Sequence, residues 1–107
     1  MKIREKVFAY ITKGSHLLVF RERGFEGFGL QIPAGTPEEV ESLEHAVLRE
    51  AVEETGLDSL IVVGHLGSVR VDQSEYGIDE VHRRHFYRSS VKKKPLNRGI
   101  MWSQIQA

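Results

Sequence analysis

Residues 35–57 read GTPEEVESLEHAVLREAVEETGL, and this acidic stretch is the most informative part of the chain. It holds seven glutamates and a single Lys or Arg residue, Arg49. At about 100° per residue, a helix would project Glu50, Glu53 and Glu54 from one face. Like charges at this spacing repel by roughly 0.2–0.5 kcal/mol per pair. A site for a hard divalent cation would favour the cluster nonetheless, because Mg²⁺ takes oxygen ligands.

The charge of the chain is divided between this stretch and the remainder. The whole sequence has a net charge of zero, yet residues 35–57 carry seven acids and one base, whereas the remainder carries eight acids and fourteen bases. An acidic centre inside a basic remainder suits a metal site that receives an anionic substrate. The alternative is an ordinary helix with a solvated acidic face.

Length and composition place the chain in a broad class. The 107 residues predict a single domain over residues 1–107, with about 91–107 as an atypical tail. Cysteine is absent, which excludes disulfides and thiolate chemistry. No apolar run approaches the roughly 20 residues that span a bilayer, and the charged start MKIREKVF is unlike a signal peptide. We therefore expect a cytoplasmic protein without a membrane partner.

Alternating apolar residues predict strands on both sides of the acidic stretch. Before it, we expect a hairpin of Val7–Thr12 and Leu17–Arg23, and an extended run at Leu30–Ile32. After it, Leu60–Val71 and Val81–Ser89 are expected strands. Within the first of these, two glycines at positions 64 and 67 indicate a bulge or tight packing.

A helix is expected over residues 43–55, which contain few breakers. Ser42 is a candidate N-cap and Gly56 a natural residue just past the C-terminus. The face expected to pack on the sheet, away from the glutamates, consists of Leu48, Ala51, Val52 and Thr55. In the tail, one short apolar element, strand or helix, is expected from Ile100, Met101, Trp102 and Ile105. The order of elements predicts an α+β domain with a mixed sheet.

The spacing of fixed residues in this stretch carries a family resemblance. Gly35, five residues, Glu41, seven residues and then the run Arg49–Leu57 resembles the Nudix box, G-x5-E-x7-R-E-U-x-E-E-x-G-U, where U is a bulky apolar residue. Every fixed position is met, although Ala51 is smaller than usual. Residues 30–35 also look like the strand that enters the box, so the resemblance covers about residues 5–90. It implies a mixed sheet with the box helix packed on it.

The resemblance implies a reaction and a set of site residues. Nudix enzymes hydrolyse a pyrophosphate bond in a nucleoside diphosphate derivative or a nucleoside triphosphate, with Mg²⁺ or Mn²⁺. The matching metal ligands are the Gly35 carbonyl and Glu50, Glu53 and Glu54. Either Glu50 or Glu53 would also orient or deprotonate the water, and Arg49 would pair with an acid of the box, expected to be Glu41. The alternative is a Nudix-fold module that binds metal and nucleotide without useful turnover.

Residues for substrate recognition lie outside the box and are less specific. Cationic side chains that would receive phosphates include Arg21, Arg23 and Arg84, and the aromatic candidates for stacking on a base are Phe28 and Tyr76. The competing interpretation is solvation for the arginines and ordinary packing for the aromatic residues.

The segment after the last expected strand is shorter than in the family. We therefore expect the C-terminal helix layer to be reduced or missing. Either the tail folds differently, or a second subunit supplies the layer, or the chain is a truncated relative; an uncovered sheet face would favour a homodimer. The expected partner is a small nucleotide. Nucleic acid is an unlikely partner because the net charge is zero.

Overall fold

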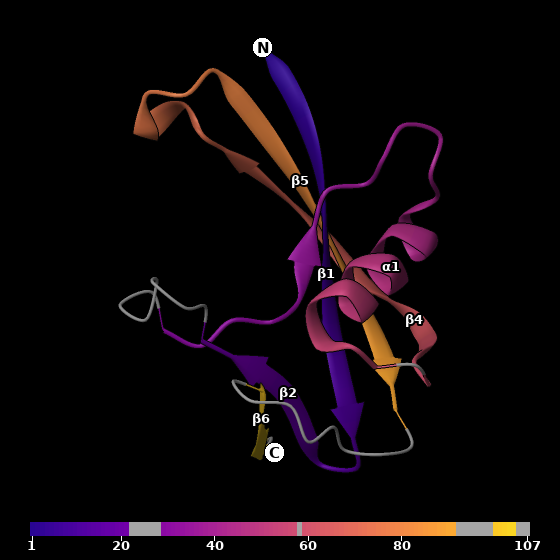
Figure 1. Ribbon diagram of the computed structural model, residues 1–107. Coiled ribbons are helices and arrows are strands. Elements are labelled where there is room, and N and C mark those ends of the chain that lie inside the picture. Colours follow the sequence, from indigo (N-terminus) through magenta and orange to yellow (C-terminus); the bar gives the residue numbers. More distant parts are fainter. Residues whose placement is uncertain (22–28, 58, 92–99, 105–107) are drawn as a thin grey trace.

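The computed structural model describes residues 1–21, 29–57, 59–91 and 100–104 (Figure 1). In these residues, one α-helix packs on a six-stranded mixed sheet. No helix in this part of the chain is long and apolar enough to cross a membrane. The strands are β1 Lys2–Lys13, β2 His16–Phe20, β3 Ala34–Gly35, β4 Ile61–Asp72, β5 Glu80–Ser90 and β6 Ile100–Gln104; the helices are α1 Leu43–Thr55 and the short 3-10 helix η2 Ser74–Tyr76.

The sheet is ordered β4-β5-β1-β2-β6, and β3 pairs with β1. Strands β1 and β5 run parallel, whereas the other strand pairs are antiparallel. The mixed sheet with a packed helix confirms the α+β class expected from the sequence. The long β1–β5 pairing begins at Lys2 opposite Glu80, which explains why β1 starts well before Val7, the first residue of the expected strand.

The expected irregularity of β4 is present. The pairing of β4 with β5 shifts register between Val62 and Gly64 and again between His65 and Gly67. Gly67 has a φ of 158°, a backbone conformation that residues with a side chain rarely adopt. The bulges therefore alter which face of β4 presents each side chain, a point that matters for a polar cluster described below.

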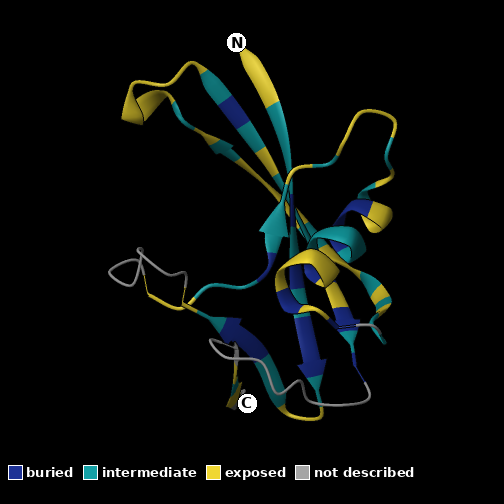
Figure 2. Cartoon of the chain, viewed as in Figure 1, coloured by how far each residue is buried: buried dark blue, intermediate teal, exposed yellow. Residues whose placement is uncertain are grey.

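The core lies between α1 and one face of the sheet (Figure 2). Alternate residues of β1 point into it, because successive side chains of a strand point to opposite faces. From β1 and β2 the core takes Val7, Ala9, Ile11 and Leu18; from α1 it takes Ala46, Val47 and Ala51.

The packing face of α1 matches the expected one at Ala51 and Thr55 but not at Leu48 and Val52. Its buried residues are Ala46, Val47, Ala51 and Thr55, whereas Val52 is 40% exposed and Leu48 is only partly buried. The expectation placed the glutamates opposite the core. In fact the buried stripe includes Ala46 and Ala51, whose small side chains let the helix approach the sheet closely. Glu50 is partly buried, whereas Glu53 and Glu54 are exposed.

The described part of the tail forms β6, which settles the open choice between strand and helix. Leu18 pairs with Trp102, and Trp102 packs against the core. Ile105 lies outside the described residues. The expected loss of the C-terminal helix layer concerns residues 91–107, of which the structure describes Val91 and residues 100–104.

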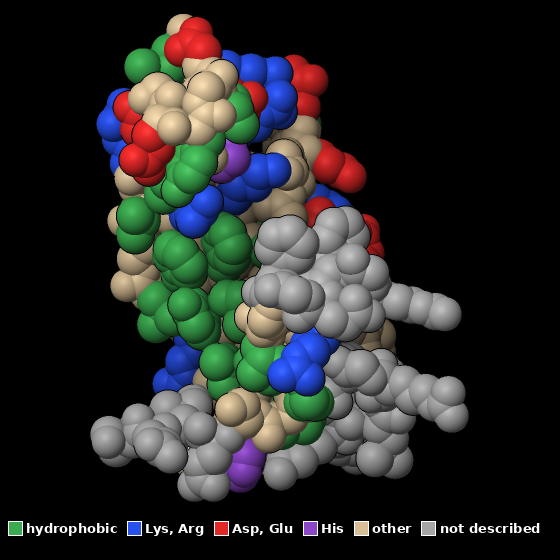
Figure 3. Space-filling view, turned by 90° about the vertical axis from the view of Figure 1, so that its left-hand side faces the viewer, with side chains coloured by type: hydrophobic (Ala, Val, Ile, Leu, Met, Phe, Trp, Pro, Cys, Tyr) green, Lys and Arg blue, Asp and Glu red, His purple; other side chains and the backbone are tan. Residues whose placement is uncertain are grey.

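The sheet face away from α1 carries exposed apolar side chains (Figure 3). Val69 pairs with Arg84, and Met101 with Val19, on this face. Leu66 and Val69 are more than half exposed, and Met101 is 40% exposed. An open hollow of about 360 Å³ lies on the same face and is lined by Tyr10, Thr12, Gly14, Leu17, Leu66 and Arg88.

Candidate functional site

The ends of α1 are fixed by local hydrogen bonds, as the sequence predicts. The Ser42 side chain accepts the backbone N–H of His45 at 3.1 Å, which caps the first turn. Gly56 adopts a left-handed conformation with φ of 73°, and its N–H donates to the Val52 carbonyl at 2.8 Å. These caps fix the two ends of α1 and therefore place Glu50, Glu53 and Glu54 in its last two turns.

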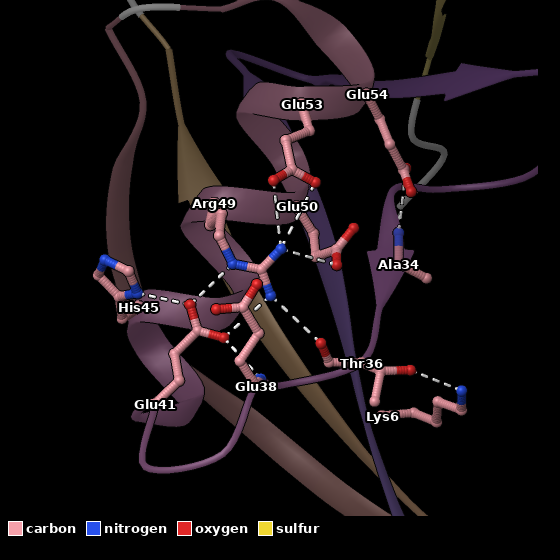
Figure 4. A network of polar contacts seen from close by, with 10 residues as sticks. All are labelled: Lys6, Ala34, Thr36, Glu38, Glu41, His45, Arg49, Glu50, Glu53 and Glu54. Carbon is pink, nitrogen blue, oxygen red and sulfur yellow. Dashed lines mark hydrogen bonds and ion pairs between the residues drawn. The ribbon is translucent and has the colours of Figure 1, made fainter.

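Two of these carboxylates reach the short strand β3 (Figure 4). The Ala34 N–H donates to Glu54 Oε2 at 3.2 Å. Gly35 lies so close to Glu50 that an added Cβ would overlap the Glu50 carboxyl group. Position 35 therefore has no room for a side chain while Glu50 keeps its place.

Arg49 connects the carboxylates to the loop before the helix (Figure 4). Its Nε and Nη2 donate to the two oxygens of Glu41, at 2.8 and 2.9 Å. Its Nη1 donates to Glu50 at 3.0 Å and to Glu53 at 3.3 Å. The structure therefore contains the predicted Arg49–Glu41 pair in two-point form, which fixes the guanidinium plane as well as its position.

Glu41 is the most heavily bonded acid of the site, and its side chain is only 7% exposed. Besides Arg49, it accepts the Glu38 N–H at 2.9 Å and contacts His45 Nδ1 at 2.6 Å. The Arg49 hydrogen bonds, and after them the Glu38 N–H, hold the pKa of Glu41 well below its ordinary value. The same pairing, led by the bond to Glu41, raises the pKa of Arg49. Both groups are therefore charged at neutral pH.

The donor chemistry of the site fits a divalent metal ion. Three carboxylates stand on one helix, and two of them lie against β3, where the Gly35 backbone is accessible at close range. In the described residues, no three His, Cys, Asp or Glu side chains converge on one metal position. Instead Arg49 Nη1 bridges Glu50 and Glu53, and its single positive charge offsets only part of their negative charge because the same guanidinium also pairs with Glu41.

The structure does not bring the expected substrate residues to this cluster. Arg21 is exposed just after β2, and Tyr76 is 68% exposed in η2 between β4 and β5. Arg84 lies on the sheet face away from α1, with its guanidinium carbon 6.0 Å from the Phe8 ring centroid. Arg23 and Phe28 lie outside the described residues.

Three residues that sequence reasoning did not single out belong to the network. The Thr36 carbonyl accepts Arg49 Nη2 at 3.2 Å, and the Thr36 hydroxyl accepts Lys6 Nζ at 2.7 Å. His45 contacts Glu41 as described above. The four-residue separation of His45 from Glu41 was a usable signal, whereas nothing in the sequence links Lys6 to residue 36.

Comparison with known proteins agrees with this geometry. The family model for the NUDIX domain matches residues 2–104. A solved NUDIX hydrolase from Nitrosomonas europaea is 26% identical, with a TM-score of 0.73; the match covers 96% of this chain and 73% of that one. No curated protein matches significantly.

More distant structures share the fold. A NUDIX-family hydrolase from Clostridium perfringens is 15% identical with a TM-score of 0.72, over 97% of this chain and 82% of that one. The Ap4A hydrolase of C. elegans is 13% identical with a TM-score of 0.71, over 95% of this chain and 80% of that one.

The fold and site together define a hydrolase whose carboxylate-bearing helix packs on a mixed sheet. The chain belongs to the Nudix family. Members of this family hydrolyse pyrophosphate bonds in small nucleoside derivatives and generally need divalent metal ions.

Proposed function

We propose that this chain hydrolyses a pyrophosphate bond in a nucleoside diphosphate derivative or a nucleoside triphosphate, with Mg²⁺ or Mn²⁺. The observation that carries the proposal is the placement of Glu50 and Glu54 against β3 while Arg49 braces Glu41. Residue types, spacing and local structure agree at this one place. A chance acidic helix would lack both the strand without a side chain at position 35 and the two-point brace.

The proposed roles follow from charge and position. Glu50, Glu53, Glu54 and the Gly35 carbonyl would hold the ion, which neutralises charge that develops on the phosphate oxygens. Glu50 or Glu53 would orient or deprotonate the attacking water. Arg49 would keep the carboxylates in position from its anchor on Glu41. Because Arg49 Nη1 bonds both Glu50 and Glu53, the guanidinium must yield part of these contacts when the ion binds.

We propose that residues outside α1 recognise the substrate. The candidates for phosphate and base contacts are Arg21, Arg23, Arg84, Phe28 and Tyr76. Of these, Arg84 lies over the Phe8 ring on the sheet face away from α1.

One observation favours a second candidate function, a module that binds nucleotide and metal without useful turnover. Arg49 already pairs with Glu50 and Glu53, so the ion must compete with an internal cation. A module of this kind would bind Mn²⁺ and nucleotide yet release no product.

The test is a panel of nucleoside triphosphates and nucleoside diphosphate derivatives incubated with the whole protein. Phosphate and pyrophosphate release is measured with Mg²⁺, with Mn²⁺ and with excess EDTA. The proposal predicts release with at least one substrate that stops when EDTA removes the ion. Binding of Mn²⁺ by calorimetry without any release would support the second candidate.

We also propose that two copies associate through the sheet face away from α1. Leu66, Val69 and Met101 expose apolar surface there, and a second copy of the chain would bury it. The mass in solution tests this proposal, as argued below.

A further inference from the structure

A chain of polar side chains crosses three strands of the sheet. His85 on β5 lies between two partners: its Nε2 is 2.6 Å from Glu5 Oε2 on β1, and its Nδ1 is 2.7 Å from Ser68 Oγ on β4. His65 Nε2 lies 3.0 Å from the same Ser68 oxygen. The strand pairing explains the order. Ser68 is directly opposite His85 on one side, and on the other Glu5 lies two residues before Val7, the partner of His85, and so on the same face.

The acceptor character of Glu5 determines the direction of every hydrogen bond. A carboxylate only accepts, so His85 Nε2 carries the proton and donates to Glu5. In the neutral imidazole, Nδ1 is then the acceptor, and the Ser68 hydroxyl donates to it. His65 Nε2–H in turn donates to Ser68 Oγ. The four side chains form one directed relay that ends on Glu5.

The relay has the parts of an activated serine. A hydroxyl faces an imidazole base, and a carboxylate fixes the tautomer of that base, as in nucleophilic hydrolases generally. Ser68 is exposed, whereas the His85 side chain is only 14% exposed. Arg83 Nη1, 3.3 Å from Glu5 Oε1, holds the carboxylate from its other side. The nucleophile is thus accessible and the base is shielded.

Among the described residues, the relay shares no hydrogen bond with the carboxylate site, although Glu5 lines one hollow together with Thr36, Glu38 and Glu41. The hydrogen bonds of the relay stay within β1, β4 and β5. Those of the carboxylate site join α1, β3 and the loop between them. The β4 bulge contributes to the arrangement, because the register shift between His65 and Gly67 lets two residues three apart, His65 and Ser68, meet on the same face.

We propose that Ser68 is the nucleophile of a second site, which takes small carboxylic esters with good leaving groups. Ser68 Oγ bonds to the acyl carbon while its proton passes to His85 Nδ1. The bond from the acyl carbon to the leaving oxygen breaks, and the departing alcohol takes the proton from His85. Water then attacks the acyl-serine, with His85 accepting its proton and returning it to Ser68, which releases the acid.

His65 and Glu5 support this reaction in different ways. The His65 N–H, which donates to Ser68 Oγ, would be available to the carbonyl oxygen of an acyl group on that atom, where negative charge develops. Glu5 is a positioning residue, because within the described part of the chain its side chain hydrogen-bonds to His85 and Arg83, and it acts by fixing the His85 tautomer.

The test labels the whole native protein with a fluorophosphonate probe and locates the adduct by peptide mass spectrometry. The proposal predicts labelling at Ser68 that is lost in urea, is absent in Ser68→Ala and is unchanged by EDTA. Ser15→Ala, at an exposed serine in the β1–β2 turn, is the matched control and should be labelled normally. Labelling of native Ser68 no faster than of Ser15, or equal labelling in urea, would overturn the proposal without bearing on pyrophosphate hydrolysis.

Turnover and tautomer state give two further readouts. Wild-type protein should release nitrophenol from p-nitrophenyl acetate, and His85→Asn should slow release about 100-fold or more, the usual contribution of a general base. Glu5→Gln can donate to Nε2, so the His85 ¹⁵N signals should change to the Nδ1–H form as release slows. Equal release by Ser68→Ala, or unchanged His85 signals in Glu5→Gln, would contradict the relay.

Discussion

At the scale of single residues, the absence of a side chain at position 35 decides where Glu50 can lie. An alanine Cβ would overlap the Glu50 carboxyl group, which sits at the end of a flexible side chain and can move away. We therefore expect Gly35→Ala to reduce nucleotide hydrolysis by about 10- to 100-fold, as misplaced site groups commonly do. The urea midpoint should change little, because the backbone is not obstructed.

Gly64→Ala is the matched control for this prediction. Gly64 also lies in a strand, it has no positive φ, and an added Cβ would meet nothing within 4 Å. Hydrolysis rates of the two variants under identical metal concentrations make the comparison. Equal activity of Gly35→Ala and Gly64→Ala would show that the Glu50 position is irrelevant to catalysis.

Glu41 makes the stability of the site depend on pH. Its folded-state pKa lies below the ordinary value of 4.5, chiefly because Arg49 donates to it. An acid with a lowered pKa stabilises the fold fully above its unfolded pKa and loses that contribution as pH falls through the folded one. Glu41→Gln should therefore be less stable than wild type at pH 7, and the gap should narrow only below about pH 4.5.

Urea unfolding of both proteins in EDTA at pH 7, 5, 4 and 3 measures this gap. Glu38→Gln is a suitable control, because Glu38 contributes only its backbone N–H to Glu41. A gap that stays constant from pH 7 to pH 3 would mean that Glu41 is not held ionised by its partners.

At the scale of elements, the loop that leads into α1 stores strain at one residue. Val40 is fully exposed and has a φ of 60°, a left-handed conformation that β-branched residues avoid. Asn tolerates this conformation, so Val40→Asn should stabilise the fold by about 1 kcal/mol. Val63→Asn, at an exposed strand residue, should instead destabilise it, because β-branched residues favour strands. Urea midpoints that do not separate the two variants would refute the strain.

The elements themselves were largely predictable, and the reasons are local. The limits of α1 followed from Ser42 and Gly56, whose capping depends on neighbours within four residues. The buried face of α1 was not predictable in the same way. The buried face of the helix depends on how closely the sheet can approach Ala46 and Ala51. That contact joins residues far apart in the sequence, so the residues of one helical turn do not specify it.

In the candidate site too, contacts between residues close in sequence were predictable and contacts between distant residues were not. The Arg49–Glu41 pair lies within the box and was expected, and the structure contains it. The contacts of Lys6 with Thr36 and of Glu5 with His85 join residues far apart in sequence. They depend on β1 pairing with both β3 and β5, and no pattern in the sequence specifies that order of strands.

At the scale of the whole molecule, the exposed apolar face predicts association. We expect a dimer at micromolar concentration, with mass measured by gel filtration and light scattering. Val69→Asp should shift the protein to monomer because it places a charge on that face, whereas Val52→Asp on α1 should not. A wild-type monomer at micromolar concentration would contradict the proposed interface.

The central claim is that the carboxylates of α1 make this chain an active pyrophosphate hydrolase. The most direct measurement compares wild type with Glu53→Gln for phosphate and pyrophosphate release across the nucleotide panel, with Mg²⁺ or Mn²⁺. Glu53 is exposed on α1, so the substitution should leave the fold intact. We predict that wild type exceeds the variant by about 100-fold or more on at least one nucleotide, the scale expected for loss of a metal ligand or base. Wild-type release no greater than that of Glu53→Gln on every nucleotide would contradict the claim.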